Sequence, residues 1–225
     1  MGPFIELQNV SKIYRTGNIQ YTALTDINKH IDKGSYVAIT GKSGSGKSTL
    51  LNMITGIDNP SSGTITISNE EISNFNEQQL TKWRGRNIGI VFQFFQLLPT
   101  ISIIDNLVLA MDFVGKISKS KRKSRASELL EITGIVSHAY KYPGELSGGE
   151  QQRAAISRAL VNNPEIIIAD EPTGNLDSVN SQIVIDIFKQ LHHQGKTIIT
   201  VTHDQIDTSQ YDEVIRLSDG KIIEQ

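Results

Sequence analysis

A glycine-rich segment at residues 41–49 has the residue types and spacing that bind phosphate groups. It fits the pattern G-x-x-x-x-G-K-[ST]. Its members are Gly41, Lys42, Ser43, Gly44, Ser45, Gly46, Lys47, Ser48 and Thr49. Glycines allow the backbone to curl so that successive N–H groups point inward, and a helix start behind them adds partial positive charge. We expect Lys47 to reach the β- and γ-phosphates and the Ser48 hydroxyl to bind Mg²⁺. This segment, named the phosphate loop below, predicts a nucleoside triphosphate site.

The residues on either side of the phosphate loop supply the elements that it needs. Residues 36–40 form a short apolar run that is typical of a buried strand, and residues 50–54 are typical of a helix. The alternative is a glycine-rich turn that binds nothing. The strand–loop–helix order argues against that alternative, because this order is the context in which the pattern binds phosphate.

Polar residues that could act on a phosphate follow three further apolar runs. These are Gln93, the pair Asp170 and Glu171, and His203. Open α/β sheets bind ligands outside the carboxyl ends of their strands. Asp170 suits an Mg²⁺ ion bound through water, and Glu171 could polarise a water aimed at the γ-phosphate. His203 could hydrogen-bond the γ-phosphate. Taken singly, a solvated acidic loop and a structural histidine remain alternative interpretations.

A second helix start behind two glycines lies in residues 146–153, Leu-Ser-Gly-Gly-Glu-Gln-Gln-Arg, named the signature segment below. Ser147 is expected to be the N-cap, and Glu150 three residues later completes a capping box. Because a helix N-terminus attracts negative charge, this segment predicts a second anion site.

The order of the expected elements predicts an α/β fold. Strands alternate with helices along most of the chain, which favours a mainly parallel core sheet. Residues 4–10 and 23–31 alternate like half-buried strands, so we expect an antiparallel β subdomain at the N-terminal side. Helical periodicity predicts a helical subdomain at about residues 100–160, inserted into the α/β body of a single domain, residues 1–225. Residues 218–220, Ser-Asp-Gly, predict a hairpin turn.

The composition is that of an ordinary globular protein. The chain has 225 residues, of which 38% are hydrophobic and 20% charged, and a length of this order fits one domain. A net charge of −2 argues against a general nucleic-acid binder. The absence of cysteine excludes disulfides and cysteine metal sites. The longest uncharged run, residues 87–104, is too polar to cross a bilayer, and the N-terminus lacks the build of a signal peptide.

Residues 116–125 form a basic run that allows more than one interpretation. It could contact acidic lipid headgroups or nucleic acid. The simpler interpretation is a solvated helix start, since no aromatic residues are interleaved as single-strand binders require.

Together, these motifs resemble those of the ATPase subunits of ABC transporters over essentially the whole chain. The most specific match is the signature segment, which is similar to the LSGGQ-type sequence that other phosphate-loop ATPases lack. The resemblance implies that the start of this helix closes over the γ-phosphate of an ATP held by a second copy. The residues concerned are Ser147, Gly148, Gly149 and Glu150. It therefore implies a head-to-tail homodimer with two ATP molecules between the copies.

The resemblance also assigns roles to single residues. Tyr14 matches the aromatic residue that stacks on adenine, although from the sequence pattern alone it could be a hairpin aromatic that covers the core. Gln93 matches the glutamine that contacts Mg²⁺ and links the nucleotide to a membrane partner. Residues 175–177 resemble the segment at the dimer seam. The catalytic residues expected from it are Lys47, Glu171 and His203, and the expected Mg²⁺ ligands are Ser48, Gln93 and Asp170.

Part of the chain is similar to the lipoprotein-releasing and macrolide-efflux class of these ATPases. The similar residues are 41–58, Arg84, 89–93 and 95–99. Members of this class pair with a membrane permease, which implies a peripheral location at the cytoplasmic face of the cell membrane. We expect the permease to dock near Gln93, Phe94 and Phe95, where Leu97 and Leu98 extend the apolar surface. The alternative is an apolar loop that folds onto its own core.

The leading hypothesis from the sequence is an ATP-hydrolysing motor that drives a permease, for export or for lipoprotein- or peptide-type substrates. An alternative, which the cell-division relatives imply, is a regulatory ATPase that signals through a permease-like partner without moving a solute. A third is an ABC ATPase acting on DNA or ribosomes. The slightly acidic balance argues against this third hypothesis, and no nucleic-acid partner is expected.

Overall fold

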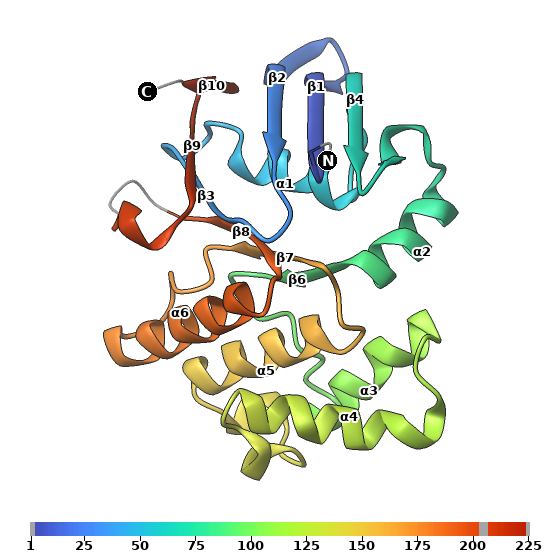
Figure 1. Cartoon of the computed structure of the whole chain (residues 1–225), viewed down its shortest axis with the longest axis vertical. Coiled ribbons are helices and arrows are strands. Elements are labelled where there is room, and N and C mark those ends of the chain that lie inside the picture. The colour runs from blue at the N-terminus through green and yellow to red at the C-terminus, as the bar shows by residue number, and fades with distance from the viewer. Residues whose placement is uncertain (1–2, 203–206, 224–225) are drawn as a thin grey trace. The chain divides into compact units, whose positions relative to one another are not determined.

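The computed structural model describes residues 3–202 and 207–223. The chain divides into two compact units, each of which is described by itself (Figure 1). The first unit combines Met1–Thr81 with Gly195–Gln225, and the second is Lys82–Gln194. One helix, α2 (Glu77–Asn87), contains the boundary between them.

The first unit contains an antiparallel sheet of strands in the order β2-β1-β4-β5. The strands are β1 (Ile5–Thr16), β2 (Ile19–Ile31), β4 (Ser62–Ile67) and β5 (Glu70–Glu71). Strands β1, β2 and β4 run side by side in Figure 1. The inner parts of β1 and β2 alternate in burial, whereas the arms near their hairpin turn are largely exposed. Tyr14 and Tyr21 are cross-strand partners on these arms.

The first unit also contains a mainly parallel group of strands. They are β3 (Tyr36–Thr40), β8 (Thr197–Val201), β9 (Glu213–Ser218) and β10 (Lys221–Ile223). Strand β3 pairs in parallel with β8 on one side and β9 on the other, and β10 returns antiparallel to β9. All five residues of β3 are buried, as expected for a strand covered on both faces. Helix α1 (Lys47–Thr55) follows β3 after the phosphate loop, and two short 3-10 turns lie at Ile72–Asn74 and Thr208–Gln210.

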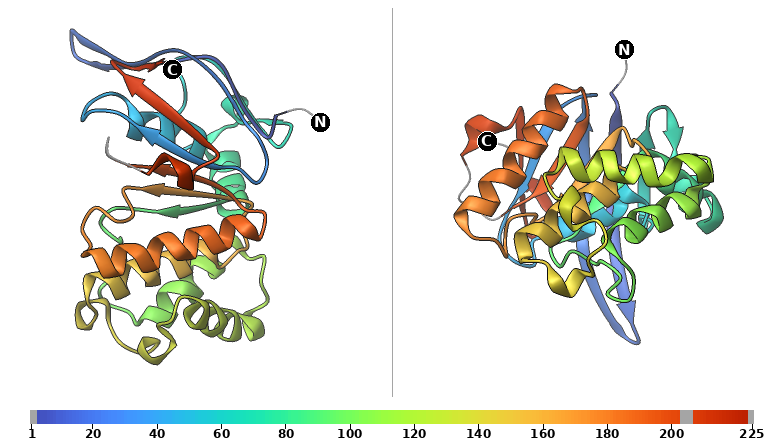
Figure 2. Two further views of the ribbon diagram at one scale, coloured as in Figure 1. Left: turned by 60° about the vertical axis from the view of Figure 1, so that its left-hand side comes forward. Right: turned by 90° about the horizontal axis from the view of Figure 1, so that it is seen from below.

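The second unit combines a parallel pair of strands with helices. The strands are β6 (Ile88–Val91) and β7 (Ile166–Asp170). The helices are α3 (Ile103–Val114), α4 (Lys119–Ile132), α5 (Gly148–Leu160) and α6 (Ser178–His193), with 3-10 turns at Val136–His138 and Pro143–Glu145. Helices α3, α4 and α5 pack on one another (Figure 2). Gly89 lies against Ala159 of α5, so β6 is in close backbone contact with that helix.

The fold class predicted from the sequence is confirmed: an α/β fold with an antiparallel N-terminal sheet, parallel strands and a group of helices. The hairpin predicted at residues 218–220 is also confirmed. Two strand boundaries were wrong. Strand β1 continues to Thr16 and β2 begins at Ile19, because the outer arms of these two strands pair with each other although they bury little. Helix α6 begins at Ser178, because Asp177 caps it by accepting a hydrogen bond from the Asn180 N–H.

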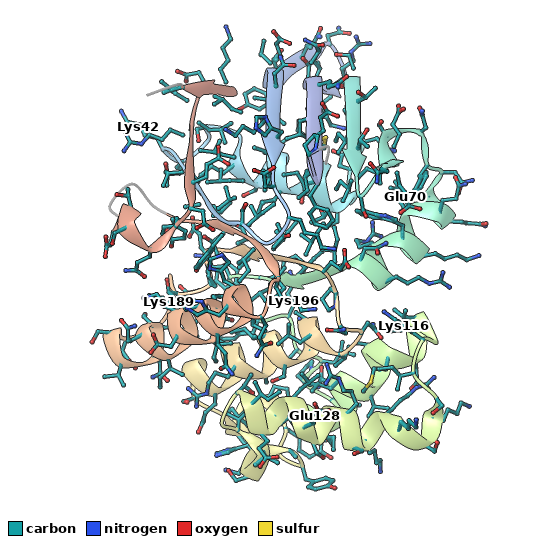
Figure 3. The ribbon with its side chains drawn as sticks, viewed as in Figure 1. Lys42, Glu70, Lys116, Glu128, Lys189 and Lys196 are labelled. Carbon is teal, nitrogen blue, oxygen red and sulfur yellow. The ribbon has the colours of Figure 1, made fainter. Side chains whose placement is uncertain are left out.

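Part of the basic run at residues 116–125 makes contacts inside the second unit. Arg122 is buried, donates to the Ile117 carbonyl at 2.8 Å and pairs with Asp112. Lys116 donates to the Asn162 carbonyl at 3.2 Å (Lys116 is labelled in Figure 3). The interpretation as a wholly solvated helix start is therefore wrong for Arg122, whose charge is neutralised within the fold.

Among the helices in the described ranges, none is both long enough and apolar enough to cross a membrane.

Candidate functional site: the nucleotide-binding and signature segments

The phosphate loop connects the buried strand β3 to helix α1 in the first unit. Lys47 lies inside the loop and is only 7% exposed. Its ammonium group donates to the carbonyl oxygens of Gly41 at 2.6 Å and Lys42 at 2.9 Å. The Lys42 side chain, in contrast, projects outward (Figure 3). The loop thus carries a buried cation, the Lys47 ammonium, that donates two hydrogen bonds. A phosphate oxygen could accept these hydrogen bonds in place of the two carbonyl oxygens.

The start of α1 is suited to an anion. Gly46 occupies the N-cap position with φ 104°, no side chain caps the helix, and its first turn has no acidic residue. The N–H groups at a helix start that lack a side-chain cap bind anions well. The phosphate loop therefore combines a positive helix end with the charge of Lys47.

Tyr14, the residue expected to stack on adenine, is anchored at one end by an ion pair. Its hydroxyl donates to Oδ2 of Asp58 at 3.0 Å, and Lys12 Nζ donates to Oδ1 of the same carboxylate at 2.6 Å. Lys12 also lies 4.9 Å from the centre of the Tyr14 ring. Partial burial raises the pKa of Asp58, but the hydrogen bonds from Lys12, Tyr14 and the Asn59 backbone, together with the charge of Lys12, bring that pKa below its ordinary value. The ring is therefore held in a fixed place while 37% of Tyr14 stays exposed.

The signature segment in the second unit forms the predicted capping box. The Ser147 hydroxyl accepts from the Glu150 N–H, and Glu150 Oε2 accepts from the Ser147 N–H at 2.7 Å. Hydrogen bonds from the Ser147 backbone and hydroxyl lower the pKa of the Glu150 carboxyl. His138 Nε2 lies 3.5 Å from the other oxygen of Glu150. The start of α5 is thus rigid, with the carboxylate of Glu150 turned to its own cap.

Gly149 packs directly on the start of α6. A Cβ at residue 149 would overlap the side chain of Asn180, whose amide nitrogen donates to Asp177 at 2.8 Å. Arg153 Nη1 donates to the same Asn180 Oδ1 at 3.1 Å. Asp177 belongs to the segment expected at the dimer seam. Asn180 therefore connects that segment to helix α5.

The second unit brings Gln93, Glu171 and Asn175 together around Gly174. A Cβ on Gly174 would lie 3.4 Å from Gln93 Nε2 and 3.6 Å from Cβ of Glu171. The Asn175 amide donates to the Gln93 carbonyl at 3.3 Å. Strands β6 and β7 cause this meeting, because they are paired in parallel and end at the same edge.

Glu171 has a backbone conformation that is unusual for its residue type. It follows Asp170, the last residue of β7, and has φ 46°, in the left-handed region. Such a conformation costs about 1–3 kcal/mol and is concentrated at functional sites. The chain therefore departs from extended geometry directly after the last residue of β7.

The predicted site residues are divided between the two units. Tyr14 and the phosphate loop belong to the first, whereas Gln93, the signature segment, Asp170 and Glu171 belong to the second. His203 lies outside the described residues. Within the described ranges, no group of three histidine or acidic side chains is placed to hold a metal ion by itself.

Three residues that could matter here were not singled out from the sequence. Asp58 anchors Tyr14, Asn180 fills the space beside Gly149, and Arg158 of α5 holds the segment after Gln93 through two backbone carbonyls. No local pattern marks them, because each acts on a residue at least 30 positions away or on another helix. The Asp-Asn-Pro turn after α1 was the only available signal for Asp58.

Comparison with known proteins identifies the family. Residues 24–174 match the family model described as ABC transporter. An ABC transporter ATP-binding protein of Thermotoga maritima is 42% identical over 222 residues, which cover 99% of this chain and 94% of that protein. The macrolide export ATP-binding/permease protein MacB of Hahella chejuensis is 42% identical over 221 residues, but these are 98% of this chain and only 34% of MacB.

A solved structure supports the same assignment. The dimeric post-hydrolysis state of the ATP-binding cassette MJ0796, bound to ADP and Pi, is similar with a TM-score of 0.90 and 40% identity. The match covers 98% of this chain and 97% of that one. The phosphate loop, the signature segment and this likeness over the full length lead to one conclusion: the chain belongs to the ABC transporter family, as an ATP-binding domain with ATPase activity.

Proposed function

We propose that this chain is the ATP-hydrolysing subunit of an ABC transporter and powers a separate membrane permease by ATP-driven closure of a homodimer. The observation that carries the proposal is the meeting of Gln93 and Glu171 at Gly174, which brings the expected catalytic residue close to the residue expected to report to the permease. The whole chain, residues 1–225, works as one ABC ATPase domain, with a helical subdomain at about residues 100–160.

Each part of the site has a distinct task in this proposal. The phosphate loop binds the phosphates through its N–H groups and through Lys47, and Tyr14 stacks on adenine. Glu171 orients and polarises the attacking water, and its carboxylate accepts a proton from that water as the water attacks the γ-phosphate. His203 contacts the γ-phosphate.

The proposed Mg²⁺ ligands are Ser48, Gln93 and Asp170. A hydroxyl, an amide oxygen and a carboxylate are hard oxygen donors, so the set fits Mg²⁺, which keeps several waters and shares phosphate oxygens. The bound ion would neutralise charge on the phosphates. A site completed by nucleotide needs no cluster of acidic residues.

The signature segment would act on the nucleotide of a second copy. In a head-to-tail dimer, Ser147, Gly148, Gly149 and Glu150 close over the γ-phosphate that the partner's phosphate loop holds. The rigid capping box supports this role, because it presents the helix start in one conformation. The dimeric form of the MJ0796 cassette is consistent with such pairing.

The apolar residues after Gln93 are the proposed docking surface for the permease. Phe94 is 72% exposed, and Leu98 is 46% exposed, which supports docking over the alternative of a loop buried on its own core. Phe95 is half-buried, with its ring near Gly148. In MacB one protein combines ATP-binding and permease functions for macrolide export, and by analogy we propose a partner permease and an export direction. The chain would then work at the cytoplasmic face of the membrane.

Reconstitution with the co-purifying permease tests this proposal. The wild-type pair should hydrolyse ATP and move a solute, whereas Glu171→Gln should keep nucleotide binding and lose phosphate release. Lys47→Ala should lose nucleotide binding. Unchanged phosphate release by Glu171→Gln would remove Glu171 from its role, and hydrolysis without solute movement would favour signalling over transport.

A further inference from the structure

The hairpin turn between β9 and β10, residues 218–220, is bonded to the phosphate loop and to strand β2 at once. The Gly220 N–H donates to the Ser45 carbonyl at 3.0 Å. The Gly220 carbonyl accepts from the Thr25 N–H at 2.8 Å. A single residue of this turn, which we name the support turn, therefore joins the middle of the phosphate loop to the sheet.

The contact leaves no room for a side chain at residue 220. Gly220 has φ 73°, and a Cβ there would lie 2.7 Å from the Ala23 carbonyl oxygen and 3.2 Å from Cα of Leu24. These are backbone atoms of β2, which is paired along its length with β1, so they cannot rotate aside as a side chain could. Gly220 is therefore required for close approach and for its conformation.

Two glycines of the phosphate loop, Gly46 and Gly41, lie close to the support turn or to the strands beside it. A Cβ on Gly46 would lie 2.7 Å from that Ala23 oxygen and 3.6 Å from Cα of Gly220. A Cβ on Gly41 would overlap the carbonyl oxygen of Leu217 in β9. Gly41 and Gly46 thus lie close to backbone atoms of β9, β2 and the support turn, and Gly46 also lies close to the Leu24 side chain.

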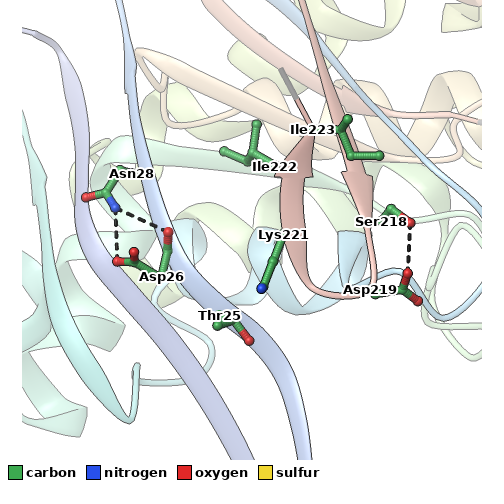
Figure 4. Close-up of a pocket in the computed structure, with 8 residues that line it drawn as sticks. All are labelled: Thr25, Asp26, Asn28, Ser218, Asp219, Lys221, Ile222 and Ile223. Atoms are coloured by element: carbon green, nitrogen blue, oxygen red, sulfur yellow. Dashed lines mark hydrogen bonds between the residues drawn. The ribbon is translucent and has the colours of Figure 1, made fainter. Parts of the chain in front are cut away.

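The outer side of the support turn faces an open hollow. Thr25, Asp26, Asn28, Ser218, Asp219, Lys221, Ile222 and Ile223 line it (Figure 4). Ser218 donates to the Asp219 carboxylate at 3.1 Å at the edge of this hollow. A substitution at Lys221 changes the hollow, whereas one at Gly220 pushes against Ala23 and the loop. Substitutions at these two positions therefore distinguish an effect of the hollow from an effect of the contact with the phosphate loop.

We propose that Gly220 is a positioning residue for nucleotide binding, which holds the phosphate loop in the curled form that accepts the phosphates of ATP. The proposal rests on the proposed function of that loop. A side chain at residue 220 displaces the turn, and with it the carbonyl of Ser45. The loop then has the conformation that binds ATP in only a fraction of the molecules. The apparent Kd is the intrinsic Kd divided by this fraction, so it rises. Saturating ATP selects the competent form, so the maximal rate is regained.

The test compares Gly220→Asn with Gly195→Asn. Asparagine tolerates the left-handed backbone better than other residues, so the effect that remains at residue 220 is crowding. Gly195 is the matched control, because it has φ 82° and nothing within 4 Å of its Cβ position. Lys221→Ala controls for the hollow, and Lys47→Ala for loss of the nucleotide site. The measurements are the Kd of a fluorescent ATP analogue, the KM and kcat for ATP, and circular dichroism for folding.

Gly220→Asn should raise Kd and KM by about tenfold or more, with kcat at saturating ATP within about twofold of the wild type. Gly195→Asn and Lys221→Ala should change Kd by less than about twofold, because neither touches the loop. A folded Gly220→Asn with unchanged Kd would overturn the positioning role, while loss of binding in Lys47→Ala would show that the nucleotide site itself stands. Retained binding in Lys47→Ala would instead contradict the proposed function.

Hydrogen exchange on the unaltered protein tests the same link without any substitution. Because the Gly220 N–H is bonded to the loop, saturating ATP should slow its exchange together with that of residues 41–49. Protection of the loop with no change at Gly220 would overturn the proposal, even if Gly220→Asn does not fold.

Discussion

Arg158 of helix α5 donates from Nη2 to the Phe95 carbonyl at 2.9 Å, and from Nη1 to the carbonyl of Gln96. Phe95 and Gln96 have φ 41° and 51°, both in the left-handed region. Burial lowers the pKa of the Arg158 guanidinium. One half-buried side chain thus holds a strained turn just after Gln93 and connects it to α5.

Replacing Arg158 with Met should release this turn. Two carbonyl acceptors lose a charged donor, so we expect the free energy of unfolding to fall by about 1–3 kcal/mol, as measured by urea denaturation. Hydrogen exchange at residues 94–98 should become faster. Arg86→Met, at an exposed arginine of α2, is the control and should leave both quantities almost unchanged. Equal stability of the two variants would show that Arg158 does not hold the turn.

The two glycines of the signature segment should differ sharply in their tolerance of alanine. Gly149→Ala places a methyl group on the Asn180 side chain, and overpacking of this kind costs roughly 1–3 kcal/mol of unfolding free energy. Gly148→Ala meets its nearest atoms at 3.7 and 3.9 Å, so its stability should be unchanged or higher by up to about 1 kcal/mol. Urea denaturation distinguishes the two.

A second substitution tests the cause of that difference. All three atoms nearest to the added methyl group belong to Asn180, so Asn180→Gly in the Gly149→Ala chain should restore part of the lost stability. If Asn180→Gly makes the double variant less stable by the same amount as in the wild type, the crowding explanation is wrong.

The anchor of Tyr14 should be measurable through Asp58. Asp58→Asn weakens the hydrogen bonds from Tyr14 and Lys12, so the Tyr14 ring is held less firmly. Because this ring is expected to stack on adenine, ATP affinity should fall by about threefold to tenfold. Asp32→Asn, at an exposed residue of the turn after β2, is the control. A fluorescent-nucleotide titration measures both. Unchanged ATP affinity in Asp58→Asn would show that the hydrogen bond between Asp58 and Tyr14 does not contribute to nucleotide binding.

The same anchor predicts a pH dependence of stability. The pKa of Asp58 in the folded chain lies below its ordinary value of 3.8. A lowered pKa stabilises the fold at a pH above 3.8, and this contribution is lost as the pH falls through the folded-state value. The stability difference between the wild type and Asp58→Asn should therefore stay constant from neutral pH down to about pH 5 and shrink below pH 3.8. A difference that grows on acidification would contradict the ion pair.

Local patterns in the sequence predicted the phosphate loop, its flanking strand and helix, and the capping box of Ser147 and Glu150. These features depend on residues within a few positions of one another, and the structure confirms that geometry. The support by Gly220, the contact of Gly149 with Asn180 and the clamp by Arg158 could not be predicted this way. Each joins segments far apart in the chain, and a glycine or arginine has no local signal for its distant neighbour.

Light scattering on the Glu171→Gln variant at saturating Mg-ATP tests the central claim most directly. If two copies enclose the nucleotide, this hydrolysis-deficient form should have the mass of a dimer with ATP and of a monomer without it. Adding Ser147→Arg, which obstructs the helix start of the signature segment, should return it to a monomer. A Glu171→Gln variant that binds Mg-ATP and yet stays monomeric, alone and with its permease, would contradict the account.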